Sequence, residues 1–108
     1  MRSGRSRMRH LGRLSGSGTL SCEGVVLGVA DFEIDGYCLK PDEVVGSGEI
    51  RMAPADLDQA FGRGNLVLTT DDGRILALRF SGSRRAAAGG AAHADIIGGL
   101  PPADEWRR

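Results

Sequence analysis

An alternation of apolar and acidic residues in the first half of the chain constrains its fold more than any other feature. From Ala30 to Asp35, three apolar residues alternate with three carboxylic acids. A period of two residues places the apolar side chains on one face of a β-strand and the acids on the other. This segment therefore predicts a strand that lies between a hydrophobic core and water.

A β-hairpin is predicted between Asn65 and Phe80, and the side-chain pattern decides its register. A two-residue turn at Asp72-Gly73 would place a leucine opposite Arg79. A three-residue turn at 71–73, with Gly73 in the left-handed conformation, pairs leucine with leucine instead. We expect this second register because it gathers the large apolar side chains on one face. The residues on that face are Leu66, Leu68, Leu76, Leu78 and Phe80.

Shorter patterns predict the remaining elements. Strands are expected around residues 19–22, 48–52 and 92–97. Pro54 and Gly62 frame a helix of about two turns, since proline favours the first helical position and glycine the position after the last. We therefore expect a mainly β fold, with about six antiparallel strands arranged as a bent sheet or a partly closed barrel with one short helix.

Charge is distributed unevenly along the 108 residues, although the formal net charge is zero. Residues 1–17 contain five arginines, no acid and few apolar side chains, a composition that favours disorder. Residues 18–83 contain eleven acids against five basic residues. We expect a disordered basic arm at 1–17, a β domain at 18–99 and a flexible C-terminal tail at 100–108, anchored only by Trp106.

The order of these elements resembles that of small uncharacterised bacterial all-β proteins. The resemblance lies in Val-Ala-Asp-Phe-Glu-Ile-Asp, Ser-Gly-Glu-Ile-Arg-Met, Ala-Asp-Leu-Asp-Gln-Ala-Phe and Leu-Val-Leu-Thr-Thr-Asp-Asp-Gly-Arg-Ile-Leu-Ala-Leu. It covers about residues 18–97 and implies a partly closed barrel or strongly bent sheet, with no residue roles. The arginine-rich, lysine-poor composition is typical of a GC-rich genome and agrees with a bacterial source.

The residues that could carry chemistry favour simple structural interpretations. The acids of 31–35 are expected to form a solvated strand face partly paired with Arg51, with a weak metal site or an acid/base pair as alternatives. Cys22 and Cys38 lack the Cys-x-x-Cys spacing of a structural zinc site. We interpret them as small apolar side chains, reduced in the cell, and expect no catalytic residue, metal or cofactor.

The chain lacks the long apolar runs of a signal peptide or a membrane span, so we expect a cytoplasmic protein. The leading functional hypothesis is a noncatalytic protein-interaction or structural module. The second face of the predicted hairpin is also apolar and needs a cover, either the helix or a second protomer. A homo-oligomer or a complex with another protein is therefore expected, a homodimer first of all. The residues predicted for its interface are Val67, Thr69, Ile75 and Ala77.

Two other functions are consistent with the sequence. Nonspecific nucleic-acid binding by the basic arm is the main alternative, because clustered arginines neutralise phosphates and release counterions. A small-molecule-binding β barrel is the third. The arginines that would contact nucleic acid are Arg2, Arg5, Arg7, Arg9 and Arg13.

Overall fold

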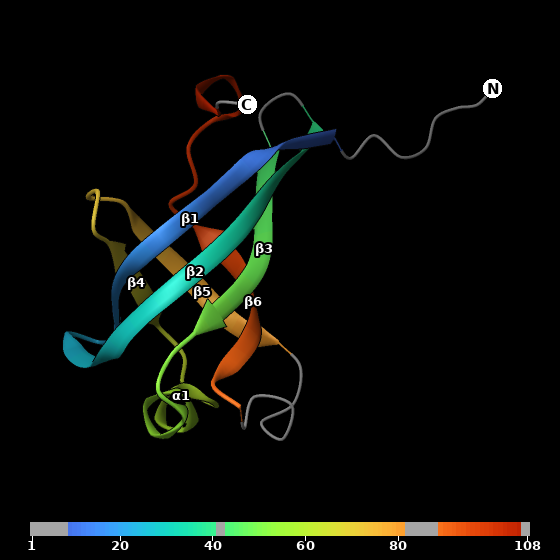
Figure 1. Cartoon of the computed structure of the whole chain (residues 1–108). Coiled ribbons are helices and arrows are strands. Elements are labelled where there is room, and N and C mark those ends of the chain that lie inside the picture. Colours follow the sequence, from blue (N-terminus) through green and yellow to red (C-terminus); the bar gives the residue numbers. More distant parts are fainter. Residues whose placement is uncertain (1–8, 41–42, 82–88, 107–108) are drawn as a thin grey trace.

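A computed structural model describes residues 9–40, 43–81 and 89–106 and shows a closed barrel of antiparallel strands with one short helix (Figure 1). The strand order around the barrel is β1-β2-β3-β6-β5-β4. The mainly β fold with six antiparallel strands and one helix is confirmed, and the sheet closes completely. In chain order the elements are β1 (Arg9–Cys22), β2 (Val25–Lys40), β3 (Glu43–Arg51), α1 (Pro54–Ala60), β4 (Leu66–Thr70), β5 (Ile75–Ser81), β6 (Ala91–Gly98) and the 3-10 turn η1 (Ala103–Glu105).

Side chains fill the interior of the barrel. Every strand contributes inward-facing residues to one continuous hydrophobic cluster, and on β2, β4, β5 and β6 these are alternate residues, as the period of two predicts. The acidic and apolar residues of 30–35 divide between water and core as expected, with Phe32 and Ile34 buried. The largest side chains in this cluster that are fully or almost fully shielded from solvent are Leu20, Ile34, Ile50, Leu57, Leu66, Leu68, Leu76 and Leu78.

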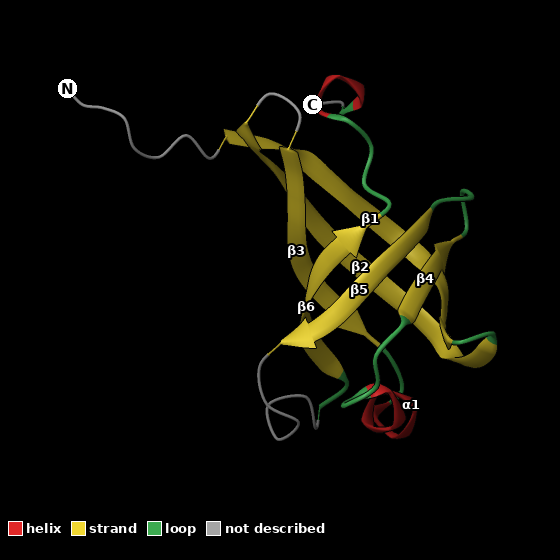
Figure 2. Ribbon diagram, turned by 180° about the vertical axis from the view of Figure 1, so that it is seen from behind, coloured by secondary structure: helices red, strands yellow, loops and turns green. Residues whose placement is uncertain are grey.

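Helix α1 closes one end of the barrel (Figure 2). It begins at Pro54, as expected, and Gly62 follows it with a φ of 83°. Leu57 and Ala60 are completely buried and belong to the core cluster. The helix therefore plugs the end of the barrel and leaves the outer faces of the strands uncovered. No helix in the part of the chain that the structure describes is long and apolar enough to cross a membrane.

The β4–β5 hairpin has the predicted three-residue turn. Leu66 pairs with Leu78 and Leu68 with Leu76, and Gly73 has a φ of 98°. Thr70, a buried polar residue at the end of β4, organises this turn. Its hydroxyl accepts a hydrogen bond from the Arg74 backbone N–H at 2.8 Å and donates one to the carboxylate of Asp72.

The N-terminal boundary of the folded part differs from the sequence-based expectation. Residues 9–17, expected within a disordered arm, form the first part of β1 and pair with β2 along their length. Leu11 is buried and Leu14 packs against the core cluster. Local composition underestimated this segment because its hydrogen bonds and ion pairs come from β2. Residues 1–8 lie outside the described residues.

The C-terminal residues 99–106, which we call the strap, leave β6 and cross the end of the barrel opposite α1 (Figure 1). We expected a flexible tail from residue 100, but Pro101 is buried and η1 forms one turn within the strap. The expected anchor is present, since the ring of Trp106 packs directly against Gly36 of β2.

Replacing Leu76 with alanine should lower the free energy of unfolding by roughly 2 to 5 kcal/mol, because the side chain is fully buried and its removal leaves a cavity. Glu33→Ala, on the solvent-facing side of β2, should stay within about 0.5 kcal/mol of wild type. Urea denaturation followed by circular dichroism measures both. Equal losses would mean that the division between core and solvent faces is incorrect.

Thr70→Val should lower the free energy of unfolding by roughly 1 to 3 kcal/mol, because the Arg74 N–H and the Asp72 carboxylate lose their shared partner. Thr69→Val provides a matched control on the same strand, since Thr69 is exposed and valine suits a strand at least as well. If thermal melts show the two substitutions to be equivalent, Thr70 does not hold the turn.

Candidate interaction surface

The four residues predicted for a protein interface all lie on the outside of the barrel. Ile75 is 63% exposed and Thr69 is also exposed, whereas Val67 and Ala77 are half-buried. The helix does not cover them, because it sits at the end of the barrel. The structure therefore brings all four together on one open face of the β4–β5 hairpin.

Barrel closure extends this face across two further strands. Pairing of β1 with β4 places Thr19 beside Thr69, and pairing of β1 with β2 places Thr19 beside Val29. Residues directly opposite one another in an antiparallel sheet point to the same side. One continuous row therefore runs across β2, β1, β4 and β5. Its members are Val29, Thr19, Thr69 and Ile75.

A second row runs parallel to the first. Ser21 pairs with Val26 on one side and Val67 on the other, and Val67 pairs with Ala77. Val26 and Val29 are among the most exposed large apolar residues of the barrel, at 65% and 70%. We call the eight residues of the two rows the uncharged wall. They are Thr19, Ser21, Val26, Val29, Val67, Thr69, Ile75 and Ala77.

Half of this wall was not predicted from the sequence. Val26 and Val29 precede the alternation at 30–35. Two valines in this position could have been recognised from the sequence as candidates for an exposed apolar face. The alignment of that strand with β4 depends on β1, which lies between them and pairs with β4 far along the sequence. Only the closed sheet shows that the two apolar faces are continuous.

The outer faces of β1, β2 and β3 on another part of the barrel carry paired charges. The expected pairing of the acidic row with Arg51 is confirmed, since the Arg51 guanidinium lies 3.9 Å from the Glu33 carboxylate. Arg13 is a second partner that the sequence did not reveal. Its Nε donates a hydrogen bond of 3.1 Å to Asp35. The Ser17 hydroxyl donates one of 2.6 Å to Asp31.

Asp35 is the best-connected carboxylate in this charged region. The hydrogen bond from Arg13 is the main cause that lowers its pKa below the ordinary value, and His10 contributes a further hydrogen bond at 3.1 Å. The same contact raises the pKa of Arg13. Both groups therefore remain charged at neutral pH, and the arginine of β1 serves to neutralise the acid of β2.

This pairing bears on the nucleic-acid alternative. Arg13 lies on β1 and contacts Asp35 and Glu33, so a phosphate would compete with two carboxylates for its guanidinium. Arg9 is exposed at the start of the strand. The three remaining arginines proposed for nucleic-acid binding, Arg2, Arg5 and Arg7, lie outside the described residues.

The positions of the cysteines and acids bear on whether they could form a metal site. Cys22 and Cys38 are both buried thiols, and the Cys22 thiol lies 3.3 Å from the Gly64 carbonyl oxygen. Within residues 9–40, 43–81 and 89–106, no group of three or more histidine, cysteine or acidic side chains is arranged to hold a metal ion.

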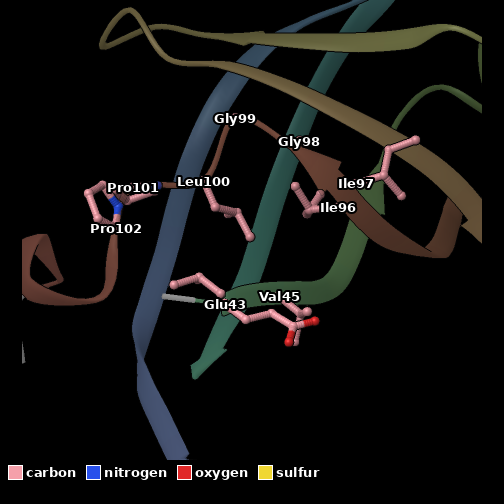
Figure 3. Close-up of a pocket in the computed structure, with 10 residues that line it drawn as sticks. Glu43, Val45, Ile96, Ile97, Gly98, Gly99, Leu100, Pro101 and Pro102 are labelled. Carbon is pink, nitrogen blue, oxygen red and sulfur yellow. The ribbon is translucent and has the colours of Figure 1, made fainter. Parts of the chain in front are cut away.

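Open space is found at the rim of the barrel, while its centre is filled. A cavity of about 640 Å³ lies between the start of β3 and the end of β6, where the strap departs (Figure 3). It is lined mainly by apolar side chains, including Val44, Val45, Ile96 and Leu100. A second cavity, of about 360 Å³, lies beside Met52. A ligand in either of these two cavities would lie at the edge of the barrel, outside the hydrophobic core cluster.

Comparisons of the chain with protein-family models, curated proteins and solved structures found no match. The fold and surface together define a small, closed, six-stranded antiparallel β barrel with one uncharged wall. The all-β character implied by the sequence resemblance is present, and no family is assigned to the chain.

Asp35→Asn should lower the melting temperature at neutral pH by a few degrees at most, because the ion pair with Arg13 is exposed and screened. The pKa of Asp35 is lowered in the folded state, so this carboxylate stabilises the fold at pH values above its unfolded pKa of about 3.9. The stabilisation is lost as the pH falls through the pKa of the folded state. The difference between variant and wild type should therefore shrink below about pH 4, and in about 1 M salt. A difference that does not change with pH would show that the carboxylate charge is not what stabilises this contact.

Proposed function

We propose that this barrel is a noncatalytic interaction module that associates with a second copy of itself through the uncharged wall. The observation that carries the proposal is the alignment of exposed, uncharged side chains in two adjacent rows across four strands. Isolated exposed apolar residues are normal on proteins, but contiguous apolar patches mark interaction sites.

The size of the wall sets the expected strength of association. Four strands about 4.8 Å apart, with side chains about 7 Å apart along each, give roughly 19 by 13 Å, or about 250 Å². A stable interface buries about 800 Å² on each partner. The contact must therefore extend to neighbouring exposed residues such as Val25 and Ile97. We expect a weak dimer, with a dissociation constant in the micromolar range.

The chemistry of the wall favours a second copy as the partner. A surface without charges offers no electrostatic pattern for selecting a different protein, whereas a two-fold axis makes any surface meet itself. The ion pairs found among the described residues, such as Arg13 with Asp35, include no residue of the wall. Self-association through these eight side chains would therefore bury apolar area without desolvating a charge among them. Such a module would work in the cytoplasm without a cofactor.

Sedimentation velocity over about 5 to 200 μM tests the proposal within the weak-affinity range. The wild type should show a concentration-dependent increase in mass toward a dimer. Ile75→Lys should remain monomeric, because it places a charge at the β5 end of one row. Val29→Lys, at the other end of the same row, should do the same.

Ala55→Lys is the matched control, since it adds the same charge at an exposed position on α1 that is not a member of the wall. It should associate like the wild type. Circular dichroism verifies that every variant is folded. A wild type that stays monomeric throughout the range, or folded wall variants that dimerise as well as the control, would overturn the proposal.

A further inference from the structure

The strap is held on the barrel by an aromatic ring that fills the place of a missing side chain. Gly36 faces inward on β2, and a Cβ there would overlap the Trp106 ring. Gly46, the partner of Gly36 on β3, similarly leaves room for Leu100, which a Cβ would approach to 3.0 Å. We call the surface formed by Gly36 and Gly46 the seat, because two strap side chains rest on it.

Two hydrogen bonds hold the strap in its own conformation. The Trp106 indole N–H donates to the Pro101 carbonyl at 3.0 Å, and the Glu105 backbone N–H donates to the Pro102 carbonyl at 2.9 Å. Both bonds connect one strap residue to another, so they survive if the strap leaves the barrel. The described contacts between strap and seat are apolar packing. Undocking therefore exposes apolar surface but breaks neither of these hydrogen bonds.

The surroundings allow the strap to move as a unit. The 640 Å³ cavity runs along one flank of the strap, between its first residues and Val44 and Val45 of β3 (Figure 3). Gly99, where the strap leaves β6, has a φ of 92°, a backbone conformation that glycine adopts readily. A few residues at the end of an element suffice to act as a hinge.

We propose that the strap docks reversibly and that the strap of one copy can occupy the seat of another. The occupant is defined by what the seat already holds, an indole ring together with the Leu-Pro-Pro segment that precedes it. This inference deepens the proposed function, because a copy bound at the uncharged wall supplies a second strap. In isolated molecules the protein's own strap has the advantage, since a short tether gives an effective concentration in the millimolar range.

A peptide experiment separates the seat from its own strap. Trp106→Ala, in the 108-residue chain, opens the part of the seat at Gly36 and removes the chain's only tryptophan. The probe is a fluorescein-labelled peptide with the sequence of residues 99–106. Fluorescence anisotropy should show saturable binding to Trp106→Ala and at least tenfold weaker binding to the wild type, whose own strap competes. The tryptophan emission of the unlabelled peptide should shift to shorter wavelength on binding to Trp106→Ala.

Two controls identify the seat. The double variant Trp106→Ala/Gly36→Ala should not bind, since the added methyl group occupies the place of the indole ring. A peptide with alanine in place of its tryptophan should not bind Trp106→Ala, and this control does not depend on folding of the double variant. Absence of binding to folded Trp106→Ala, or equal binding of the two peptides, would overturn the proposal.

Exchange between whole molecules is tested by mixing two complementary variants. Gly36→Ala has an intact strap and a blocked place for the indole ring, whereas Trp106→Ala has that place open and no indole. Both also carry Ile75→Lys, so that the uncharged wall does not contribute. Sedimentation should detect a heterodimer only in the mixture, and its absence at about 100 μM would refute exchange. Because the wall is disabled here, failure of this test leaves the proposed function standing, and failure at the wall leaves this one standing.

Discussion

Pairing between β1 and β4 is the constraint on which the rest of the structure depends. It converts a six-stranded sheet into a barrel and allows one set of side chains to fill a common interior. The seam is tight at Gly18, where a side chain would overlap the backbone of Thr69 and Thr70. Closure also explains why both faces of the β4–β5 hairpin are apolar. One face completes the core, and the other becomes part of a larger outer surface.

Charges that are separated along the sequence are brought together in the folded barrel. In the sequence, an arginine-rich beginning is followed by an acidic body. In space, the adjacent strands β1 and β2 place Arg13 against Asp35 and Glu33, so the two excesses neutralise one another in part. These ion pairs lie on the outer faces of β1 and β2, and none of them includes a residue of the uncharged wall.

Local sequence patterns predicted those features whose determinants lie close together in the chain. The hairpin register followed from leucine pairing, the strand faces from the alternation at 30–35, and the helix from Pro54 and Gly62. These patterns do not contain the register between distant strands. Ser21 and Val67 are 46 residues apart, and their adjacency makes one wall from two unrelated segments.

Two other features escaped prediction for related reasons. The early part of β1 has few apolar residues and becomes ordered only because β2 supplies its hydrogen bonds and counter-charges. The seat for Trp106 is made by Gly36, and a residue without a side chain leaves no hydrophobic pattern to detect. Trp106 itself was correctly identified as an anchor, but its partner was not.

The position of the closing seam has a consequence for how the chain acquires its structure during synthesis. β1 and β2 are connected by a tight turn at Glu23 and Gly24 and can pair as soon as both have left the ribosome. β1 must then wait for β4 before its second edge is covered, and long-range pairing of this kind is slow. During that interval the edge of residues 18–22, the part of β1 that pairs with β4, is open to other nascent chains. Thr19 and Ser21 lie on this edge, so two residues of the uncharged wall belong to the last part of the sheet to be covered.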